Sequence, residues 1–86
     1  MEALDGNAIA GALHLAFGRE MTSASGRCAT CGQINVIASL RVYFGGPGAV
    51  ARCPACGEVQ LVLIEARRLL CVDLQGLAAL SDAPAG

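Results

Sequence analysis

The sequence contains no lysine and no tryptophan, and its only aromatic residues are Phe17, Tyr43 and Phe44. Hydrophobic residues nevertheless make up 55% of its 86 positions, so any core must be built mainly from aliphatic side chains. A chain this short buries a limited share of its surface and often needs a metal, a disulfide or a partner to be stable. We therefore expect a single domain over residues 1–80, followed by a flexible tail at 81–86.

Long hydrophobic runs are also missing. The longest uninterrupted runs, such as residues 61–64, have four residues, whereas a transmembrane helix needs about 20. The N-terminus carries Glu2 and Asp5 where a secretory signal would be basic. The sequence thus predicts a cytoplasmic protein that does not act on a membrane. In that reducing compartment, cysteines at ligand spacing more often hold a metal than form disulfides.

A short α-helix is predicted over residues 5–17, because apolar residues recur there at the three-to-four spacing of one helical face. Asp5 is the expected N-cap, and Gly18 supplies the left-handed exit. Gly6 and Gly11 weaken the helix, so it has to pack on something to persist. The sequence leaves open whether that surface belongs to the same chain or to another protein.

The rest of the chain predicts three to four antiparallel strands. Residues 34–44 alternate between apolar and mixed positions, which predicts one strand of eleven residues. A turn rich in glycine follows at 45–48, and a short strand returns over 49–52. Two more strands are expected at 59–64 and 69–74, and one helical turn at 77–80.

Two cysteine motifs form the only internal repeat, Cys28-Ala29-Thr30-Cys31-Gly32 and Cys53-Pro54-Ala55-Cys56-Gly57. A C-x-x-C pair in a tight turn directs both thiolates at one ion, and the following glycine tolerates the positive φ of such a turn. The predicted strand, turn and strand account for the 21 residues between the motifs. Two such knuckles make a closed tetrahedral site. We predict one structural zinc ion bound by Cys28, Cys31, Cys53 and Cys56.

Other uses of the cysteines fit less well. The second motif resembles a knuckle of rubredoxins, which hold one iron in four cysteines, but the aromatic core typical of rubredoxins is missing. A thioredoxin-like dithiol lies between a strand and a helix, and no second helix is predicted here. Four thiols paired in turns do not serve core packing. Zinc is favoured, and iron stays open because ligand type does not separate the two metals.

Two further candidate residues have simpler structural explanations. Cys71 lies in an apolar strand and is predicted to be a buried, small hydrophobic residue rather than a ligand or nucleophile. His14 falls just off the apolar helix face, with no acid, serine or cysteine at catalytic spacing, and is predicted to be a surface or boundary residue. Four thiolates also leave a zinc ion no open position. We therefore expect neither enzymatic activity nor a small-molecule substrate.

The charge distribution argues against a strongly nucleic-acid-binding surface. The formal net charge is −1, and the segment 27–72 holds five arginines against two glutamates. Zinc with four thiolates contributes about −2 and reduces that excess of three to about +1. Domains that bind nucleic acids usually carry more positive charge. The candidates for such a surface are Arg41, Arg52, Arg67 and Arg68, with Tyr43 near Arg41 as a stacking residue.

Seven short segments spread over nearly the whole chain form a recognisable pattern together. They are Leu4–Gly11, Phe17-Gly18, Met21-Thr22, Cys28–Gly32, Tyr43–Gly48, Arg52–Cys56 and Asp73–Leu77. This pattern resembles an uncharacterised bacterial family of short zinc-ribbon-like proteins, a domain of unknown function. The resemblance includes the N-terminal segment, which it therefore assigns to the domain, and it implies the fold and the metal site but no activity.

The predicted fold is a small, metal-bound, mostly β protein. We expect a rubredoxin-like zinc ribbon of three to four antiparallel strands over about residues 27–75, with the short N-terminal α-helix beside it. The predicted function is a non-catalytic adapter that binds another protein, since apolar strands offer an edge to a partner. A nucleic-acid-binding regulator that uses the four arginines is the alternative, and an iron electron carrier comes after it.

Overall fold

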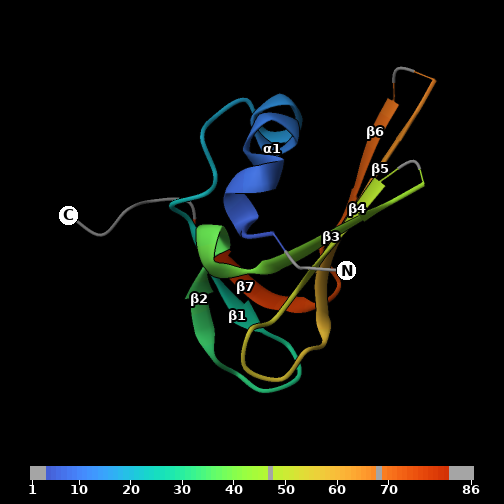
Figure 1. Ribbon diagram of the computed structural model, residues 1–86. Helices are drawn as coiled ribbons and strands as arrows, with labels where there is room; N and C mark the ends of the chain where they lie inside the picture. The colour runs from blue at the N-terminus through green and yellow to red at the C-terminus, as the bar shows by residue number, and fades with distance from the viewer. Residues whose placement is uncertain (1–3, 47, 68, 82–86) are drawn as a thin grey trace.

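The computed structural model describes residues 4–46, 48–67 and 69–81. A 3-10 helix, η1 (Gly6–Ile9), leads into the helix α1 (Ala10–Phe17), and a second 3-10 helix, η2 (Ile37–Ser39), lies between two strands (Figure 1). No helix among these residues has the length and apolarity needed to cross a membrane. The strands are β1 (Ser25–Cys28), β2 (Ile34–Val36), β3 (Arg41–Gly45), β4 (Gly48–Arg52), β5 (Val59–Ala66), β6 (Leu69–Asp73) and β7 (Leu77–Ser81).

The strands form two antiparallel sheets. One has three strands in the order β2-β1-β7, and the other has four in the order β3-β4-β5-β6. In Figure 1 the β3–β4 and β5–β6 hairpins extend away from the three-stranded sheet, and α1 lies beside them. A small, mostly β protein with antiparallel sheets and one short N-terminal helix is thus confirmed. The predicted number of strands was too low, because β1 and β7 were not predicted and the strand predicted over residues 34–44 is two strands.

The predicted start and end of the N-terminal helix are confirmed. The Asp5 side chain accepts a hydrogen bond from the Asn7 backbone N–H at 3.0 Å, so it caps the first turn. Gly18 ends α1 in the left-handed region with φ 73°, and its N–H donates to the His14 carbonyl oxygen at 2.8 Å. The first turn is 3-10 rather than α-helical.

The N-terminal segment packs on its own chain, which the sequence left open. Ile9 and Leu13 are almost fully buried in the core. Leu4 pairs with Val42 through two backbone hydrogen bonds of 2.9 and 2.7 Å, which adds one bridge to the edge of β3. Gly6 lies so close to η2 that a Cβ there would stand 1.7 Å from the Ile37 carbonyl oxygen. Packing on the core therefore stabilises a helix whose own propensity is weak.

The predicted single strand over residues 34–44 is wrong, since η2 divides it into β2 and β3. The backbone N–H groups of Ile37 and Ala38 donate to the carbonyl oxygens of Ala24 and Thr22, at 2.8 and 2.9 Å. These bonds with the segment that precedes β1 turn the chain, and Ile37 is buried. Ile34, expected on the inner face, is instead 59% exposed.

The predicted helical turn at 77–80 is also wrong, because these residues lie in strand β7. β7 pairs with β1, and Gly26 stands opposite Leu80 in the register. Residues 25–28, for which no strand was predicted, thus form β1, the central strand of the three-stranded sheet. The predicted tail begins at Ser81, which ends β7, and its other residues lie outside the described part of the chain.

Aliphatic side chains fill the core, as the composition predicts. α1 and η1 lie beside the four-stranded sheet, and Met21, Ala24 and Ile37 belong to the same buried cluster as Ile9 and Leu13. The core side chains with relative exposure of 6% or less are Ile9, Leu13, Met21, Ala24, Ile37, Leu40, Val42, Ala49, Ala51, Leu61 and Leu63.

Candidate metal centre and apolar groove

The four cysteines of the two motifs lie together. All four Sγ atoms lie within 4.8 Å of one another. The Sγ atoms of Cys28 and Cys56 are 3.6 Å apart, and those of Cys31 and Cys53 are 3.7 Å apart. Each of these two contacts joins one motif to the other. The four side chains can hold one metal ion between them.

The two knuckles have the same backbone geometry. In the first, the Cys28 N–H donates to the Gln33 carbonyl oxygen at 2.9 Å, and the Gly32 N–H donates to the Cys28 carbonyl oxygen at 3.0 Å. In the second knuckle the corresponding bonds, from Cys53 and from the glycine after Cys56, are both 2.9 Å long. The two glycines have φ values of 78° and 80°. Their left-handed backbone closes each turn, as the spacing predicts.

An arginine precedes each motif and reaches across its loop. Nη1 of Arg52 donates to the Gly57 carbonyl oxygen at 2.9 Å, and Nη1 of Arg27 donates to the Gly32 carbonyl oxygen at 3.4 Å. The Arg52 guanidinium also lies 5.9 Å from the ring centroid of Tyr43. Sequence reasoning missed this role, although the signal is present: an arginine stands directly before the first cysteine of both motifs.

Backbone amides favour the thiolate form of the two inner cysteines, Cys28 and Cys53, which are both 1% exposed. The Cys31 N–H, helped by the Thr30 N–H, lowers the pKa of Cys28 to about 6. Burial opposes ionisation of Cys53, but the N–H groups of Cys56 and Ala55 hold its pKa below the ordinary value. The side-chain amide of Asn35 also approaches the Cys53 Sγ atom, at 3.8 Å.

The two outer cysteines, Cys31 and Cys56, are exposed, and their pKa values are raised rather than lowered. The Glu58 N–H favours the Cys56 thiolate, yet loss of hydration and the three neighbouring sulfurs raise its pKa to about 12. In the same way, the Gln33 N–H opposes but does not prevent a raised pKa at Cys31. Four negative sulfurs this close repel one another, so full ionisation requires a cation among them.

The structure corrects the prediction for Cys71 and confirms the prediction for His14. Cys71 is exposed, not buried, because it stands opposite the exposed Ile64 on the outer face of the four-stranded sheet. The apolar pattern of β6 did not reveal which of its faces is covered. His14 is exposed on α1, as predicted.

The three candidate arginines that the structure describes lie at two opposite ends of the four-stranded sheet. Arg41 stands directly opposite Arg52 in the β3–β4 register, at the end of the sheet near the cysteines. Arg67 lies in the β5–β6 turn at the other end of the sheet, with φ 49°. Arg68 lies outside the described residues.

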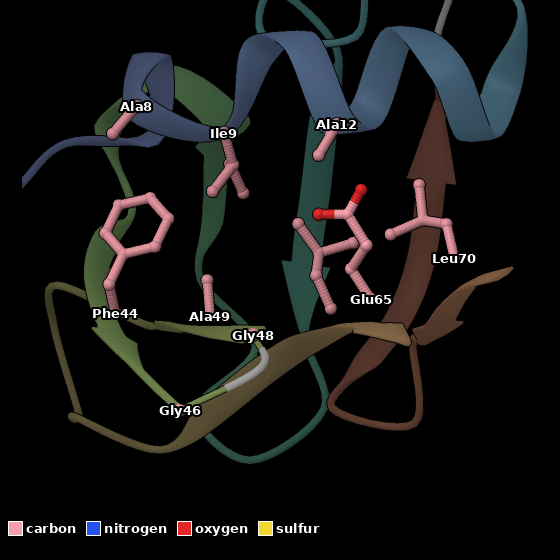
Figure 2. A pocket seen from close by; sticks show the side chains of 10 residues that line it. Ala8, Ile9, Ala12, Phe44, Gly46, Gly48, Ala49, Glu65 and Leu70 are labelled. Carbon is pink, nitrogen blue, oxygen red and sulfur yellow. The ribbon is translucent and has the colours of Figure 1, made fainter. Parts of the chain in front are cut away.

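A groove of about 240 Å³ lies between the N-terminal helices and the two hairpins. Figure 2 shows Ala8, Ile9 and Ala12 above it, with Phe44 on one side and the Glu65 carboxylate pointing toward the helix. Glu65 is the only charged residue among the described residues that line the groove. Small side chains keep the groove open between the helix and the strands. No sequence pattern marked it, because its walls come from segments far apart in the chain.

Comparison with known proteins gives one match. A profile described as "Family of unknown function (DUF6510)" matches residues 1–85. No curated protein and no solved structure matches the chain. The predicted membership of an uncharacterised family is therefore confirmed.

Proposed function

The chain belongs to the DUF6510 family of unknown function, and we propose that it is a non-catalytic accessory protein that carries one structural zinc ion and binds another protein. The observation that carries the metal assignment is the cluster of four cysteine Sγ atoms within 4.8 Å of one another. A zinc ribbon is the fold type that this pair of knuckles supports best.

The spacing of the sulfurs supports a tetrahedral ion. Zinc–sulfur bonds of about 2.3 Å in a regular tetrahedron separate the sulfurs by about 3.8 Å. The distances between sulfurs of different knuckles are 3.6 and 3.7 Å. A four-sulfur tetrahedral set accommodates zinc or iron, and zinc is the common structural choice. Because four thiolates fill the coordination shell, the site supports a structural role rather than hydrolysis.

Metal analysis of the purified protein tests this assignment. We expect one zinc per chain by inductively coupled plasma mass spectrometry and no visible absorption. Cys53→Ser should lower the zinc content, whereas Cys71→Ser, a matched control outside the cluster, should retain it. Stoichiometric iron with visible colour would contradict zinc and favour the iron electron carrier.

The groove in Figure 2 supports the protein-binding role. Its apolar walls suit a large aliphatic or aromatic side chain, and the Glu65 carboxylate at its margin suits a positive charge. We infer that its occupant is a segment of a partner protein with a large apolar residue next to a lysine or arginine. Charge complementarity of this kind contributes specificity at the rim of an interface.

Site-specific cross-linking tests the groove directly. A photo-crosslinking amino acid at Ala12, inside the groove, should capture a partner, whereas the same group at Leu15, which is 77% exposed, should not. The cross-linked peptide should contain an apolar residue beside a basic one. Glu65→Arg should abolish capture, and Glu58→Arg at another exposed glutamate should leave it unchanged. Binding lost on nuclease treatment would favour the nucleic-acid alternative instead.

A further inference from the structure

The outer face of the four-stranded sheet, away from α1, is largely apolar, and its described residues are mostly exposed or half-buried. Directly opposed residues of antiparallel strands share a face, so the register identifies its members. Ile64 is 45% exposed and Leu69 is 68% exposed. Figure 1 shows α1 on the other side of this sheet. The residues of this outer face are Arg41, Tyr43, Gly45, Gly48, Val50, Arg52, Val62, Ile64, Ala66, Leu69, Cys71 and Asp73.

The shape of the outer face changes from one half to the other. Across one row of the sheet the register runs Gly45, Gly48, Ile64 and Cys71. The β3–β4 half of this row has no side chains, and the β5–β6 half has two. A hollow of about 350 Å³ lies beside the glycines, lined also by Tyr43. The outer face therefore holds a hollow and a ridge side by side.

The charged residues of the outer face are also divided between its two halves, with the arginines on β3 and β4 and the aspartate on β6. Arg41 on β3 and Arg52 on β4 stand opposite each other at one end of the face. Asp73 lies on β6, at the other edge of the sheet, opposite Val62. Like charges that face each other across strands are unfavourable, so the arginine pair favours an acidic neighbour.

We propose that a second copy of this chain covers the outer face, which makes the protein a homodimer. A twofold axis between the two sheets, running along the strands, sets β3 of one copy over β6 of the other and β4 over β5. Ile64 and Cys71 of one copy then fill the hollow over Gly48 and Gly45 of its partner. Arg41 comes within side-chain reach of Asp73 of the second copy, twice by symmetry. Such self-complementarity is what a twofold interface requires.

The size of the face suits a weak dimer whose population depends on concentration. Three strands of five residues and one of eight, about 4.8 Å apart, span roughly 360 Å² per copy. Two such faces cover about 700 Å², less than the roughly 1,000 Å² of a stable interface, so we expect a weak dimer. Sheets pack about 10 Å apart with their strands nearly aligned, which suits this orientation. The dimer is independent of the proposed metal and of the groove, which lies on the other face of the sheet.

Measurement of the mass in solution tests the dimer. Light scattering on the metal-loaded full chain, over a series of concentrations, should give twice the 8.7 kDa of one chain. Ile64→Glu should yield a monomer. Ile34→Glu is the matched control, because Ile34 is also an exposed isoleucine, 59% against 45% for Ile64, but lies in the other sheet, and this variant should remain dimeric. A wild-type monomer at every concentration, or equal dissociation of both variants, would overturn the proposal.

Exchanging the charges of Arg41 and Asp73 tests how the two copies are oriented, without altering an apolar residue of the interface. Arg41→Asp and Asp73→Arg should each weaken the dimer about tenfold, because each places like charges together. An equal mixture of the two variants should recover the wild-type affinity, since both pairs then combine opposite charges. Failure of the mixture to recover it would overturn this orientation.

The exposed thiol of Cys71 provides a separate measurement. Its alkylation, located by peptide mass spectrometry, should be slow in the wild-type dimer and fast in Ile64→Glu. Equal rates in both proteins, at concentrations where the wild type has the mass of a dimer, would place the dimer interface elsewhere.

Discussion

Two arginines hold the loops that carry the outer cysteines. Arg27 and Arg52 occupy equivalent places before the two motifs, and each guanidinium donates to the carbonyl oxygen of the glycine that follows the second cysteine. A charged donor on a neutral carbonyl contributes more than an ordinary hydrogen bond. Each arginine therefore restrains the turn from which a thiolate must reach the ion, without touching the ion itself.

Replacement of Arg52 tests this positioning role. Arg52→Met should weaken zinc affinity by roughly threefold to tenfold, because the 2.9 Å bond to Gly57 is lost. Competition with a chromophoric chelator measures the change. Arg41→Met, which removes the arginine directly opposite, is the control and should leave the affinity unchanged. An equal loss in both variants would attribute the effect to charge alone.

The ionisation of the cysteines predicts how metal binding depends on pH. At pH 7, Cys28 is largely a thiolate because its pKa is about 6, whereas Cys31 and Cys56 keep their protons because their pKa values are raised. Binding an ion must therefore release at least two protons. Each proton that binding releases lowers the metal affinity about tenfold for every unit by which the pH is lowered. With two protons released, the affinity should fall about 100-fold per unit as the pH is lowered through 7, and more steeply below pH 6.

Calorimetry in buffers of different ionisation enthalpy measures the number of protons released. We expect two or more at pH 7 and a larger number at pH 5, where Cys28 is also protonated. Release of fewer than two protons at pH 7 would contradict the raised pKa values of the outer cysteines.

The N-terminal segment shows how one element uses two glycines differently. Gly6 is buried against η2, where a Cβ would meet the Ile37 carbonyl oxygen at 1.7 Å. Gly11 lies on the exposed side of α1, where a Cβ would meet nothing within 4 Å. The close approach at Gly6 lets η1 pack on η2, so only that glycine is required by the fold. Both look alike in the sequence.

These two positions form a matched pair of variants. Gly6→Ala should destabilise the protein by about 2 kcal/mol or more, because η1 must move away from η2. Gly11→Ala should stabilise it by about 0.5–1 kcal/mol, through higher helix propensity. Thermal unfolding of the metal-loaded protein, followed by circular dichroism, measures both. Equal effects at the two positions would contradict the packing of η1 on η2.

The metal centre joins the two sheets of the molecule. Cys28 is the last residue of β1 in the three-stranded sheet, and Cys53 directly follows β4 in the four-stranded sheet. An ion held by both motifs would tie the sheets together at their shared end. Without it, Cys31 and Cys56 keep their protons, no metal–sulfur bond joins the two motifs, and the aliphatic core has to hold the sheets alone.

Removal of the metal should therefore unfold the whole domain. We expect a strong chelator, or Cys53→Ser, to abolish the cooperative thermal transition, since the binding energy of a structural ion is folding energy. Cys71→Ser, at the exposed cysteine outside the cluster, should leave the transition in place. Cooperative unfolding that survives complete metal removal would contradict this prediction.

The sequence by itself determined the features that depend on neighbouring residues. The two C-x-x-C-G turns, the Asp5 cap, the Gly18 exit and the β4, β5 and β6 strands follow from local spacing and backbone preference. Each is decided within a few residues, where the same short-range hydrogen bonds and φ values operate in any context. The aliphatic core likewise follows from composition.

The tertiary structure alone decided what depends on contacts between distant segments. The break at η2 arises because Ile37 and Ala38 bond to the connector before β1, and β7 is a strand because β1 is free to pair with it. Likewise, β6 alternates in the same way whichever face is covered, so only the position of α1 leaves Cys71 exposed. Strand pairing and burial are set by partners far along the chain, which local pattern does not contain.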